Sequence, residues 1–378
     1  MDLDLACVIE ASRAASWPAR PIRCYTYQGI EGQILDVSRV ILYGRTLEQT
    51  IDRHDRATFV KELVVTGGKI PLAMVRKRLA NNDGGTRAPV LLVHGFGQNR
   101  YAWHLPARSM ANHLARAGYD VFNLDLRGHG RSRHFGARAV RHVDDYITED
   151  LPTAVDEVRL QTGGRPVFLV GHSLGGLVSY GAAPQLAGAL GGVVSIGSPY
   201  HFTRGSLSLQ AIALFFEGLR RAGVPHIGMP LPLYPIGAFM RTIRRVADSP
   251  FYPLPLRGWH PGALEPHVLE QHLRLAFDRA GIAELRNMFE WAADKRFGGE
   301  SRDYVEKFEA MDLPLLIVSG ANDDLAPPVS VRPAYERSRS KDKTYRTAPL
   351  GHIDLLVGRD APLATWPMLT SWLDKRAA

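Results

Sequence analysis

The sequence predicts an α/β protein whose mainly parallel sheet is covered by helices on both faces. From residue 89 onwards, short apolar runs alternate with helical patterns, which is the order that parallel strands joined by helices require. Ahead of that region, two β-rich runs flank Gly67-Gly68-Lys69 and predict a hairpin. Between residues 200 and 313 the alternation stops, which indicates an insertion.

The predicted elements follow one another with turn residues between them. The hairpin is ATFVKELVVT followed by IPLAMVRKRL, and NNDGGTRAP then predicts a loop. Further strands are predicted at PVLLVHG, YDVFNLDLRG, RPVFLVG, GGVVSIGSP, LPLLIVSG and KTYRTAP. Helices are predicted at RSMANHLARAG, DDYITEDLPTAVDEVRLQTGG, LGGLVSYGAAPQLA and WPMLTSWLDKR, the first two ending in glycine.

The breaks in this pattern divide the chain into three parts. Residues 57–199 and 314–378 predict the α/β core, residues 200–313 a mainly helical cap or lid insertion, and residues 1–56 an N-terminal extension of uncertain structure. In the insertion, LSLQAIALFFEGLRRAG predicts an apolar amphipathic helix, and segments rich in proline and aromatic residues follow it. The extension shows helix-like apolar spacing at Val37, Val40, Ile41 and Leu47.

Composition narrows the class of protein. Hydrophobic residues make up 45% and charged residues 22% of the 378 residues, as in an ordinary folded globular protein. The net charge of +8 raises the question of nucleic acid or an anionic membrane surface as a partner. Because the chain has no zinc-ligand spacing, aromatic RNA-binding motif or dense basic block, we expect a scattered basic surface and no nucleic acid partner.

Cysteine usage and the N-terminal residues bear on the compartment. The chain has two cysteines, Cys7 and Cys24, which excludes a disulfide framework. The first residues are acidic and lack the apolar region of a secretory signal, and the sequence has no Asn-x-Ser/Thr sequon. No apolar run approaches the ~18 residues that a spanning helix needs. These observations predict a cytoplasmic location.

Ser173 is the candidate nucleophile. It lies in VGHSLGG, after an apolar strand and before a predicted helix, with Gly171 and Gly175 two positions away on each side. Such a strand–turn–helix context is typical of a nucleophile elbow, in which strained backbone angles project the serine hydroxyl above the sheet. The two glycines are expected because side chains there would collide with the neighbouring strand and helix.

A serine hydroxyl needs a base to take its proton, and two histidines compete for that role. His172 precedes Ser173 on the same tight turn, so its side chain should point elsewhere and lie against the fold. His352, in LGHIDLL, follows the last predicted strand, from which a loop can carry it over Ser173. We therefore assign the base to His352 and interpret His172 as structural. His94 is interpreted as a brace for the loop that it opens.

The histidine needs an acid that fixes its tautomer. SGANDDLAPP follows an apolar strand and offers Asp323 and Asp324, of which the position of Asp323, three residues after Gly320, favours Asp323. The segment after the preceding strand, SIGSPYHF, has no carboxylate.

The oxyanion that forms on the substrate needs backbone donors. One should be the amide of Leu174, at the start of the helix after the nucleophile, where the helix dipole adds favourable charge. The second should be the amide of Phe96 in HGFG, because Gly95 and Gly97 permit an unusual turn.

These pieces together resemble the α/β-hydrolase superfamily. The matching segments are VHGFGQN, YDVFNLDLRGHGRSR, VGHSLGG, SIGSP, SGANDDLAP and LGHIDLL, over about residues 57–200 and 314–375. The run from HGFG through Trp103 to GYDVFNLDLRGHGRSR is similar to the lipase and esterase branch, including acid-lipase-like enzymes. That resemblance implies a Ser-His-Asp triad and a helical cap over an apolar acyl site. The chain departs from secreted acid lipases in lacking a signal peptide and sequons.

The nucleophile type separates this chain from some members of that superfamily. Haloalkane dehalogenases and epoxide hydrolases use aspartate at this position, and polyester synthases of similar organisation use cysteine. Ser173 instead favours hydrolysis of a carboxylic ester or thioester with an apolar acyl or bulky group, with His352 as base and Asp323 orienting it. No metal or organic cofactor is required by that chemistry.

Other interpretations stay open at this stage. An acyltransferase or a carbon–carbon bond hydrolase would use the same triad, and a non-catalytic binding protein of the same fold would have lost part of it. Phe215 and Phe216 either roof the substrate pocket or form the core of the insertion. A transient membrane-surface contact through the basic charge and the Phe215 region is a further hypothesis. The sequence does not predict the oligomeric state.

Overall fold

The computed structural model describes residues 40–82, 84–223, 230–232, 234–249, 257–293 and 303–377. Both cysteines, most of the N-terminal extension and much of the Pro- and aromatic-rich part of the insertion lie outside these ranges, and so do the expectations that concern them.

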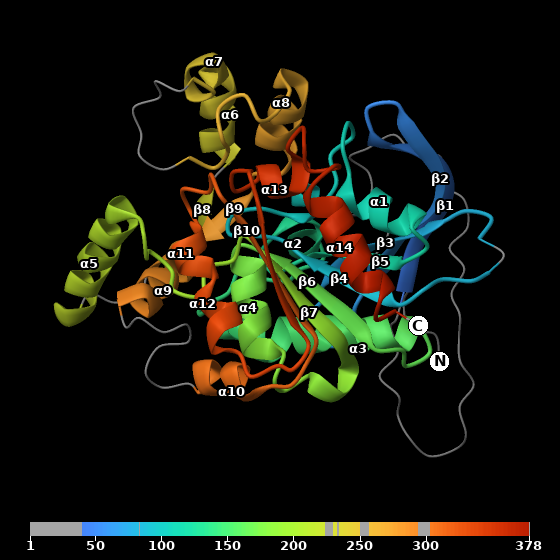
Figure 1. The fold of residues 1–378 in the computed structure, drawn as a ribbon, viewed down its shortest axis with the longest axis horizontal. Helices are drawn as coiled ribbons and strands as arrows, with labels where there is room; N and C mark the ends of the chain where they lie inside the picture. The colour runs from blue at the N-terminus through green and yellow to red at the C-terminus, as the bar shows by residue number, and fades with distance from the viewer. Residues whose placement is uncertain are drawn as a thin grey trace, which may run out of the picture. The chain divides into compact units, whose positions relative to one another are not determined.

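A nine-stranded sheet forms the centre of the described chain (Figure 1). Its strands run in the order β1-β2-β3-β5-β4-β6-β7-β10-β11. The pairs from β5 to β11 are parallel, and β1, β2, β3 and β5 pair with one another antiparallel. The strands are β1 (Val40–Asp52), β2 (Asp55–Val65), β3 (Ala73–Leu79), β4 (Pro89–Val93), β5 (Asp120–Asp125), β6 (Val167–His172), β7 (Leu190–Ile196), β10 (Leu315–Gly320) and β11 (Lys343–Ala348).

The antiparallel end of the sheet differs from the prediction in one respect. Strands β2 and β3 form the predicted hairpin, but Val40, Ile41 and Leu47 lie in strand β1, so the helix-like spacing of the extension is wrong as a guide to structure. The register runs from Val40 opposite Val65 to Asp52 opposite Asp55, with shifts between Ile41 and Tyr43 and between Thr50 and Asp52, so β1 pairs with β2 along its length. That non-local pairing overrides a weak local pattern, and the sheet begins at Val40 rather than at residue 57.

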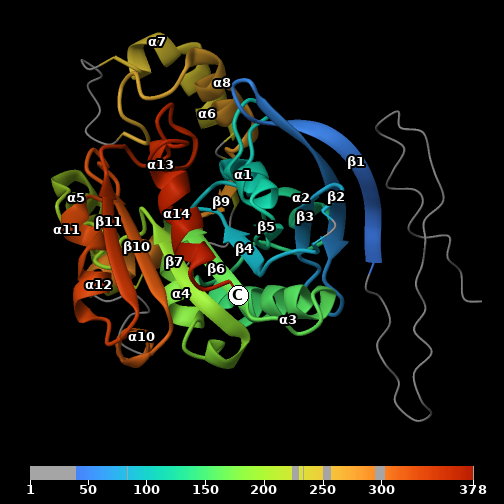
Figure 2. The same cartoon turned by 45° about the vertical axis from the view of Figure 1, so that its right-hand side comes forward.

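The inner parallel strands β4, β5, β6, β7 and β10 are buried on both faces, as their apolar sequences predict, whereas the edge strand β11 is partly exposed. In β4, Val90 and Leu92 pack into one hydrophobic cluster, and Leu91 and Val93 pack into the cluster on the opposite face. One cluster holds α3 (Leu151–Gln161), α4 (Leu174–Ala182) and α10 (Tyr304–Ala310), and the other holds α1 (Met110–Arg116), α13 (Asp354–Val357) and α14 (Thr365–Asp374) (Figures 1 and 2). The described chain has the predicted α/β architecture.

The segment between β7 and β10 is mainly helical in its described parts. Helix α5 packs against α9, and α6 packs against α8, while α10 packs against α4 in the core layer. A short antiparallel pair, β8 with β9, lies within the same segment. The elements are α5 (Leu207–Arg221), β8 (Pro230–Pro232), α6 (Tyr234–Thr242), α7 (Arg244–Ala247), α8 (Pro266–Leu275), β9 (Arg279–Gly281) and α9 (Ile282–Ala293). Further short α-helices lie outside it: α2 (Gly130–His134), α11 (Pro328–Val331) and α12 (Pro333–Arg337).

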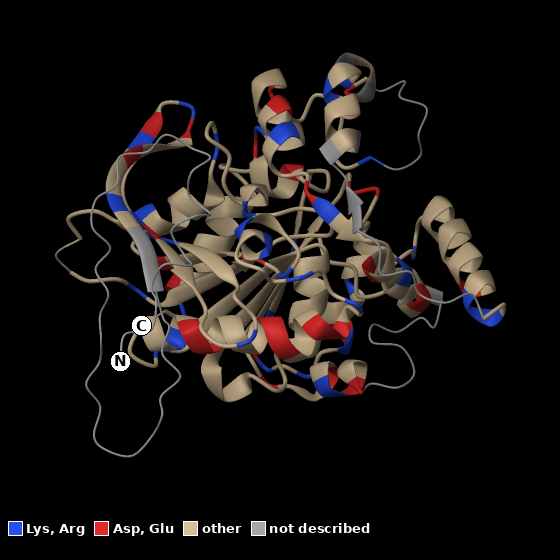
Figure 3. Ribbon diagram, turned by 180° about the vertical axis from the view of Figure 1, so that it is seen from behind, with Lys and Arg blue, Asp and Glu red and all other residues tan. Residues whose placement is uncertain are grey.

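Charged residues are dispersed over the described chain. Figure 3 shows basic and acidic positions interspersed on the side that it displays, without one continuous basic face. None of the described helices has the length and apolar character needed to cross a bilayer.

Candidate active site

The predicted site residues lie at one edge of the sheet. Ser173 follows strand β6, Asp323 follows β10, His352 follows β11 and Phe96 follows β4. All four strands are parallel, so their carboxyl ends meet at the same edge, where open α/β sheets bind ligands.

The turn at Ser173 has the strained geometry that an elbow requires. Ser173 has φ 54° and ψ −121°, angles that a residue with a side chain adopts only when its surroundings enforce them. A Cβ at Gly171 would lie 2.4 Å from the backbone of Gly175, and a Cβ at Gly175 would lie 2.3 Å from the carbonyl oxygen of Val93. The spacing of the glycines is therefore set by contacts of the helix with the strands beneath it.

His352 and Asp323 form a buried acid–base pair. The distance from His352 Nδ1 to Asp323 Oδ2 is 2.8 Å, and both side chains are buried. Asp323 Oδ1 accepts hydrogen bonds from the amides of Leu325, at 2.9 Å, and Ala326, at 2.7 Å. These bonds fix the carboxylate and leave Oδ2 for the imidazole. Asp324, the other carboxylate considered from the sequence, is exposed.

The neighbouring loop after β7 makes room for this pair. Gly197, in the carboxylate-free SIGSP segment, has φ 56°. A Cβ at this position would lie 3.3 Å from Asp323 Oδ2 and 3.6 Å from His352 Nδ1. The residue after β7 therefore lies against the acid–base pair and contributes space rather than a carboxylate.

His172 supports the loop that carries His352. Its Nε2 donates to the backbone carbonyl of His352 at 3.2 Å, and the two imidazole rings are 4.7 Å apart. Burial, together with the nearby charge of His352, lowers the pKa of His172 well below its ordinary value. A neutral imidazole committed to a backbone carbonyl agrees with the structural role inferred from the sequence. The sequence did not indicate that its partner is the His352 loop itself.

Two free backbone amides lie beside the site, that of Phe96 in the loop after β4 and that of Leu174 at the start of α4. The Gln98 amide donates to the Gly95 carbonyl at 3.3 Å, and Gly97, with φ 63°, occupies the turn that this bond closes. Within the part of the chain that the structure describes, neither the Phe96 amide nor the Leu174 amide has a hydrogen-bond acceptor. Unpaired amides at these positions are what an oxyanion hole requires.

His94 braces this loop from below. Its Nε2 accepts from the Leu126 amide at 3.1 Å, so its Nδ1 carries the proton and donates to the Gly95 carbonyl at 2.9 Å. Burial lowers the pKa of His94, which keeps this pattern of one donor and one acceptor.

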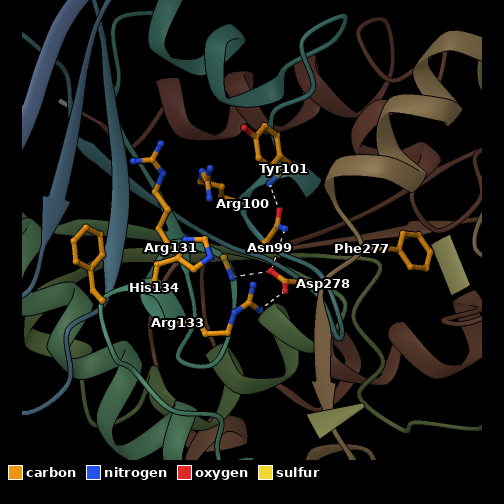
Figure 4. A pocket seen from close by; sticks show the side chains of 10 residues that line it. Asn99, Arg100, Tyr101, Arg131, Arg133, His134, Phe277 and Asp278 are labelled. Carbon is orange, nitrogen blue, oxygen red and sulfur yellow. Dashed lines mark hydrogen bonds and ion pairs between the residues drawn. The ribbon is translucent and has the colours of Figure 1, made fainter. Parts of the chain in front are cut away.

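Asp278, the residue immediately before β9, connects the insertion to the same loop. Its Oδ2 accepts from Asn99 Nδ2 at 3.2 Å and from the Gly130 amide at 2.7 Å, and its Oδ1 pairs with Arg133 (Figure 4). The Asp278 amide donates to the Gly97 carbonyl at 2.9 Å. Burial opposes ionisation, but the bonds from Arg133 and Gly130 lower the pKa of Asp278 to about 2. This ionised carboxylate joins the core and the insertion beside the loop after β4, which carries Phe96.

A mainly apolar cavity of about 260 Å³ opens beside Ser173. Phe96, Ser173, Leu174 and His352 all line it, so the structure brings the predicted nucleophile, base and oxyanion donors to one space. Phe215 and Phe216 do not line it: Phe215 is exposed, and Phe216 stacks on Phe289 at 5.4 Å. Other residues of the insertion line it instead, namely Phe202, Leu209, Gly258, Trp259, His272, Phe277, Leu285, Met288 and Phe289.

Two of the residues near this cavity escaped the sequence analysis. His272 lies on α8, and the buried positions Val268, Leu269 and Leu273 of that helix show a helical period that places His272 on the inner face. Asp354 follows His352 by two residues, and its Oδ2 accepts from the amides of Gly351 and His260 at 3.0 and 2.7 Å. His272 could have been found from the helical period of α8. The role of Asp354 could not, because it depends on a hydrogen bond from His260, which is distant in the sequence. Burial raises the pKa of Asp354 to about 7.

Comparison with known proteins places this chain in a class. A family model described as the alpha/beta hydrolase fold matches residues 88–222. In solved structures, a soluble variant of the monoglyceride lipase from Saccharomyces cerevisiae has a TM-score of 0.58 at 18% identity, over 83% of this chain and 96% of that one. That likeness shows the fold. Over residues 88–222 the chain therefore matches the alpha/beta hydrolase fold, and its likeness to solved structures extends that fold over most of the chain.

Two curated relatives show how the likeness extends along the chain. The poly(3-hydroxyalkanoate) polymerase subunit PhaC of Haloferax mediterranei is 24% identical over 360 residues, which cover 88% of this chain and 69% of that protein. The monoacylglycerol lipase of Mycolicibacterium smegmatis is 26% identical over 270 residues, which cover 71% of this chain and 81% of that protein.

Proposed function

We propose that this protein is a serine hydrolase that cleaves a carboxylic ester or thioester with an apolar acyl group. The observation that carries the proposal is the shared lining of one apolar cavity by Ser173, on its strained turn, and by His352, which is paired with Asp323 at 2.8 Å. The insertion, residues 200–313, acts as the cap that shapes this cavity over the core of residues 57–199 and 314–378. The cytoplasmic location of the protein stays a prediction.

The chemistry follows the order of a Ser-His-Asp triad. Ser173 Oγ attacks the carbonyl carbon while His352 Nε2 takes the hydroxyl proton, and Asp323 holds Nδ1 and stabilises the imidazolium. The Phe96 and Leu174 amides donate to the tetrahedral oxyanion. His352 then gives its proton to the leaving oxygen or sulfur, which leaves an acyl group on Ser173. Water, deprotonated by His352, releases the acid and restores the serine. No metal or organic cofactor enters these steps.

A second candidate function is acyl transfer to an alcohol. It uses the same residues and differs in the group that attacks the acyl-enzyme. The similarity to the PhaC polymerase subunit over 88% of this chain supports acyl transfer as the alternative. Carbon–carbon bond hydrolysis also remains compatible with the triad. Product analysis with and without an added alcohol distinguishes transfer from hydrolysis, because transfer yields a new ester.

Replacement of Ser173 by alanine tests the proposal. Turnover of p-nitrophenyl esters, graded by acyl chain length, should fall by about 10⁴-fold or more in Ser173→Ala. A fluorophosphonate probe should label the wild-type protein and leave the variant unlabelled, and circular dichroism should show that both are folded. Retained turnover in the folded variant would contradict the mechanism. Absence of both labelling and turnover in the wild type would favour a non-catalytic binding protein instead.

A further inference from the structure

The apolar cavity beside Ser173 contains two polar side chains that lack a hydrogen-bond partner. Within the described residues, neither His272 Nδ1 nor His272 Nε2 has a partner, and Gln98 Oε1 also has none. All three atoms are buried, and both residues line the cavity. A buried polar atom without a partner costs free energy, so each of these atoms calls for a group supplied by whatever fills the cavity.

His272 stands out on its own helix. Helix α8 buries Val268, Leu269 and Leu273 on the same face, and the His272 side chain is 1% exposed among them. Its ring lies edge-on to Phe277 with 5.9 Å between centroids. A leucine would suit these surroundings better on packing grounds alone. The position therefore points to a polar role at the cavity wall.

The ionisation state of His272 limits what that role can be. Burial lowers the pKa of His272 to about 4, so the imidazole is neutral near pH 7. A neutral imidazole has one N–H donor and one acceptor nitrogen. It can hydrogen-bond an uncharged group, but it offers no charge to a carboxylate or phosphate. A charged substituent would therefore be buried without a counter-ion in this cavity.

Gln98 places the second polar atom close to the nucleophile. Gln98 Oε1 lies 3.0 Å, and Ser173 Cβ 3.1 Å, from the same point, which is where a Cβ on Gly95 would stand. The two atoms are therefore no more than about 6 Å apart. Because the acyl carbon becomes bonded to Ser173 Oγ, a substituent a few bonds along the acyl chain is within reach of Gln98. The alcohol part of the ester, in contrast, leaves the cavity once the acyl-enzyme has formed.

The donor and acceptor properties identify the substituent. Gln98 Oε1 only accepts hydrogen bonds, so its partner must carry a donor. A keto or ether oxygen only accepts and would leave this atom unpaired. A hydroxyl group donates through its hydrogen and accepts through its lone pairs, so it suits both Gln98 Oε1 and the N–H of His272. A hydroxyl is also uncharged, as the apolar cavity requires.

We infer that the acyl group of the substrate carries a hydroxyl that Gln98 and His272 bind inside the apolar cavity, which makes esters of hydroxy acids the preferred substrate class. This inference rests on the proposed ester hydrolysis. His272 and Gln98 are then specificity-determining residues, because a substrate without the hydroxyl leaves their buried atoms unpaired.

The test uses p-nitrophenyl esters that differ at one substituent. Each ester bearing a hydroxyl at a given carbon is compared with one bearing a methyl at that carbon and with the unsubstituted chain. The substituent is moved along the chain one carbon at a time. For the wild-type protein, kcat/KM for the hydroxyl ester at the best position should exceed that for the methyl ester by about 10- to 100-fold.

Variants assign that preference to residues. His272→Leu and Gln98→Leu should each reduce the hydroxyl-to-methyl ratio of kcat/KM by about 10-fold. His272→Gln, which keeps a donor and an acceptor, should restore part of the ratio and serves if the leucine variant does not fold. His267→Leu is the matched control, since His267 is exposed on the same helix, and it should keep the wild-type ratio.

The possible outcomes distinguish a failure of this inference from a failure of the proposed ester hydrolysis. Equal turnover of hydroxyl and methyl esters by the wild-type protein, or an unchanged ratio in His272→Leu, would overturn the inference and leave ester hydrolysis standing. A preference for a hydroxyl on the alcohol part instead would also overturn it. Failure to hydrolyse any ester, with no fluorophosphonate labelling, would overturn both.

Discussion

The sheet core and the insertion differ in how fully they bury their apolar residues. Strands β4 and β6 are buried along their whole length, whereas α5 leaves Leu207, Leu214 and Phe215 exposed by 84, 71 and 63%. A strained serine persists only where its surroundings over-determine the backbone, and the buried sheet provides that. The insertion contributes residues to the cavity wall, but it leaves apolar side chains of α5 exposed to solvent. Under the proposed function, the catalytic residues therefore come from the rigid core, and the insertion adds further walls to the cavity that holds the substrate.

The largest effect should come from the acid in the core. Asp323→Asn keeps the shape of the side chain but removes the charge that stabilises the imidazolium, so kcat should fall by about 10⁴-fold. Asp324→Asn is the matched control, and its kcat should stay within a few-fold of the wild-type value. Steady-state kinetics on one p-nitrophenyl ester measures both. Equal losses in the two variants would refute the assignment of the acid to Asp323.

The next effect concerns the packing beneath the elbow. Gly175→Ala would bring a Cβ to within 2.3 Å of the Val93 carbonyl oxygen, which belongs to the buried backbone of β4. Relief requires a shift of strand or helix, so we expect the free energy of unfolding to fall by more than about 3 kcal/mol. Gly188→Ala, at a position with open space around it, should change it by less than about 1 kcal/mol. Urea denaturation distinguishes the two, and similar midpoints would contradict the packing argument.

A smaller, pH-dependent effect should arise where the insertion meets the His352 loop. Asp354 ionises near pH 7 in the folded protein, because of burial, and near pH 4 when unfolded. The folded state therefore gains stability from the bound proton below about pH 4, and this gain is lost as pH rises through about 7.

Asp354→Asn removes this titration and keeps an acceptor oxygen for the amides of His260 and Gly351. Relative to the variant, the wild-type protein should lose about 1–3 kcal/mol of unfolding free energy between pH 4 and pH 7, with little further change above that range. Urea denaturation at several pH values measures the difference, in which other titrating groups cancel. A difference independent of pH would show that Asp354 does not titrate in this range.

The smallest effect should come from the open side of the insertion. Phe215→Ser should change the free energy of unfolding by less than about 0.5 kcal/mol, because Phe215 is already exposed. Phe289→Ser, in the buried cluster of α5 and α9, should cost about 3 kcal/mol. The membrane-surface hypothesis adds that Phe215→Ser should lower co-sedimentation with anionic vesicles. Absence of vesicle binding by the wild-type protein would remove that hypothesis.

The sequence predicted the parts of the fold that local signals specify. Ser173 has a glycine on each side and a strand before it, and the buried strands carry unbroken apolar runs, so the elbow and the parallel sheet could be expected. Strand β1 could not, since its partner is the edge of a hairpin and its own pattern is ambiguous.

The site shows the same limit. His352 and Asp323 were predicted from their place after strands, and the structure adds the 2.8 Å contact between them. The hydrogen bond from His172 to the His352 carbonyl joins residues 180 positions apart, and no local pattern reports it. His272 belongs to an insertion without a recognisable motif, and its meaning appears only when α8 is seen against the cavity.

The carboxylate of Asp278 has a consequence for engineering. Asp278 immediately precedes β9 and hydrogen-bonds Asn99, Gly130 and Arg133, so it is one of the contacts that hold the insertion against the loop after β4. A chimera that exchanges the insertion for that of another enzyme must bring an acid to this position. Without it, the exchange would loosen the loop that carries Phe96, and a swap meant to alter selectivity would also damage the catalytic step.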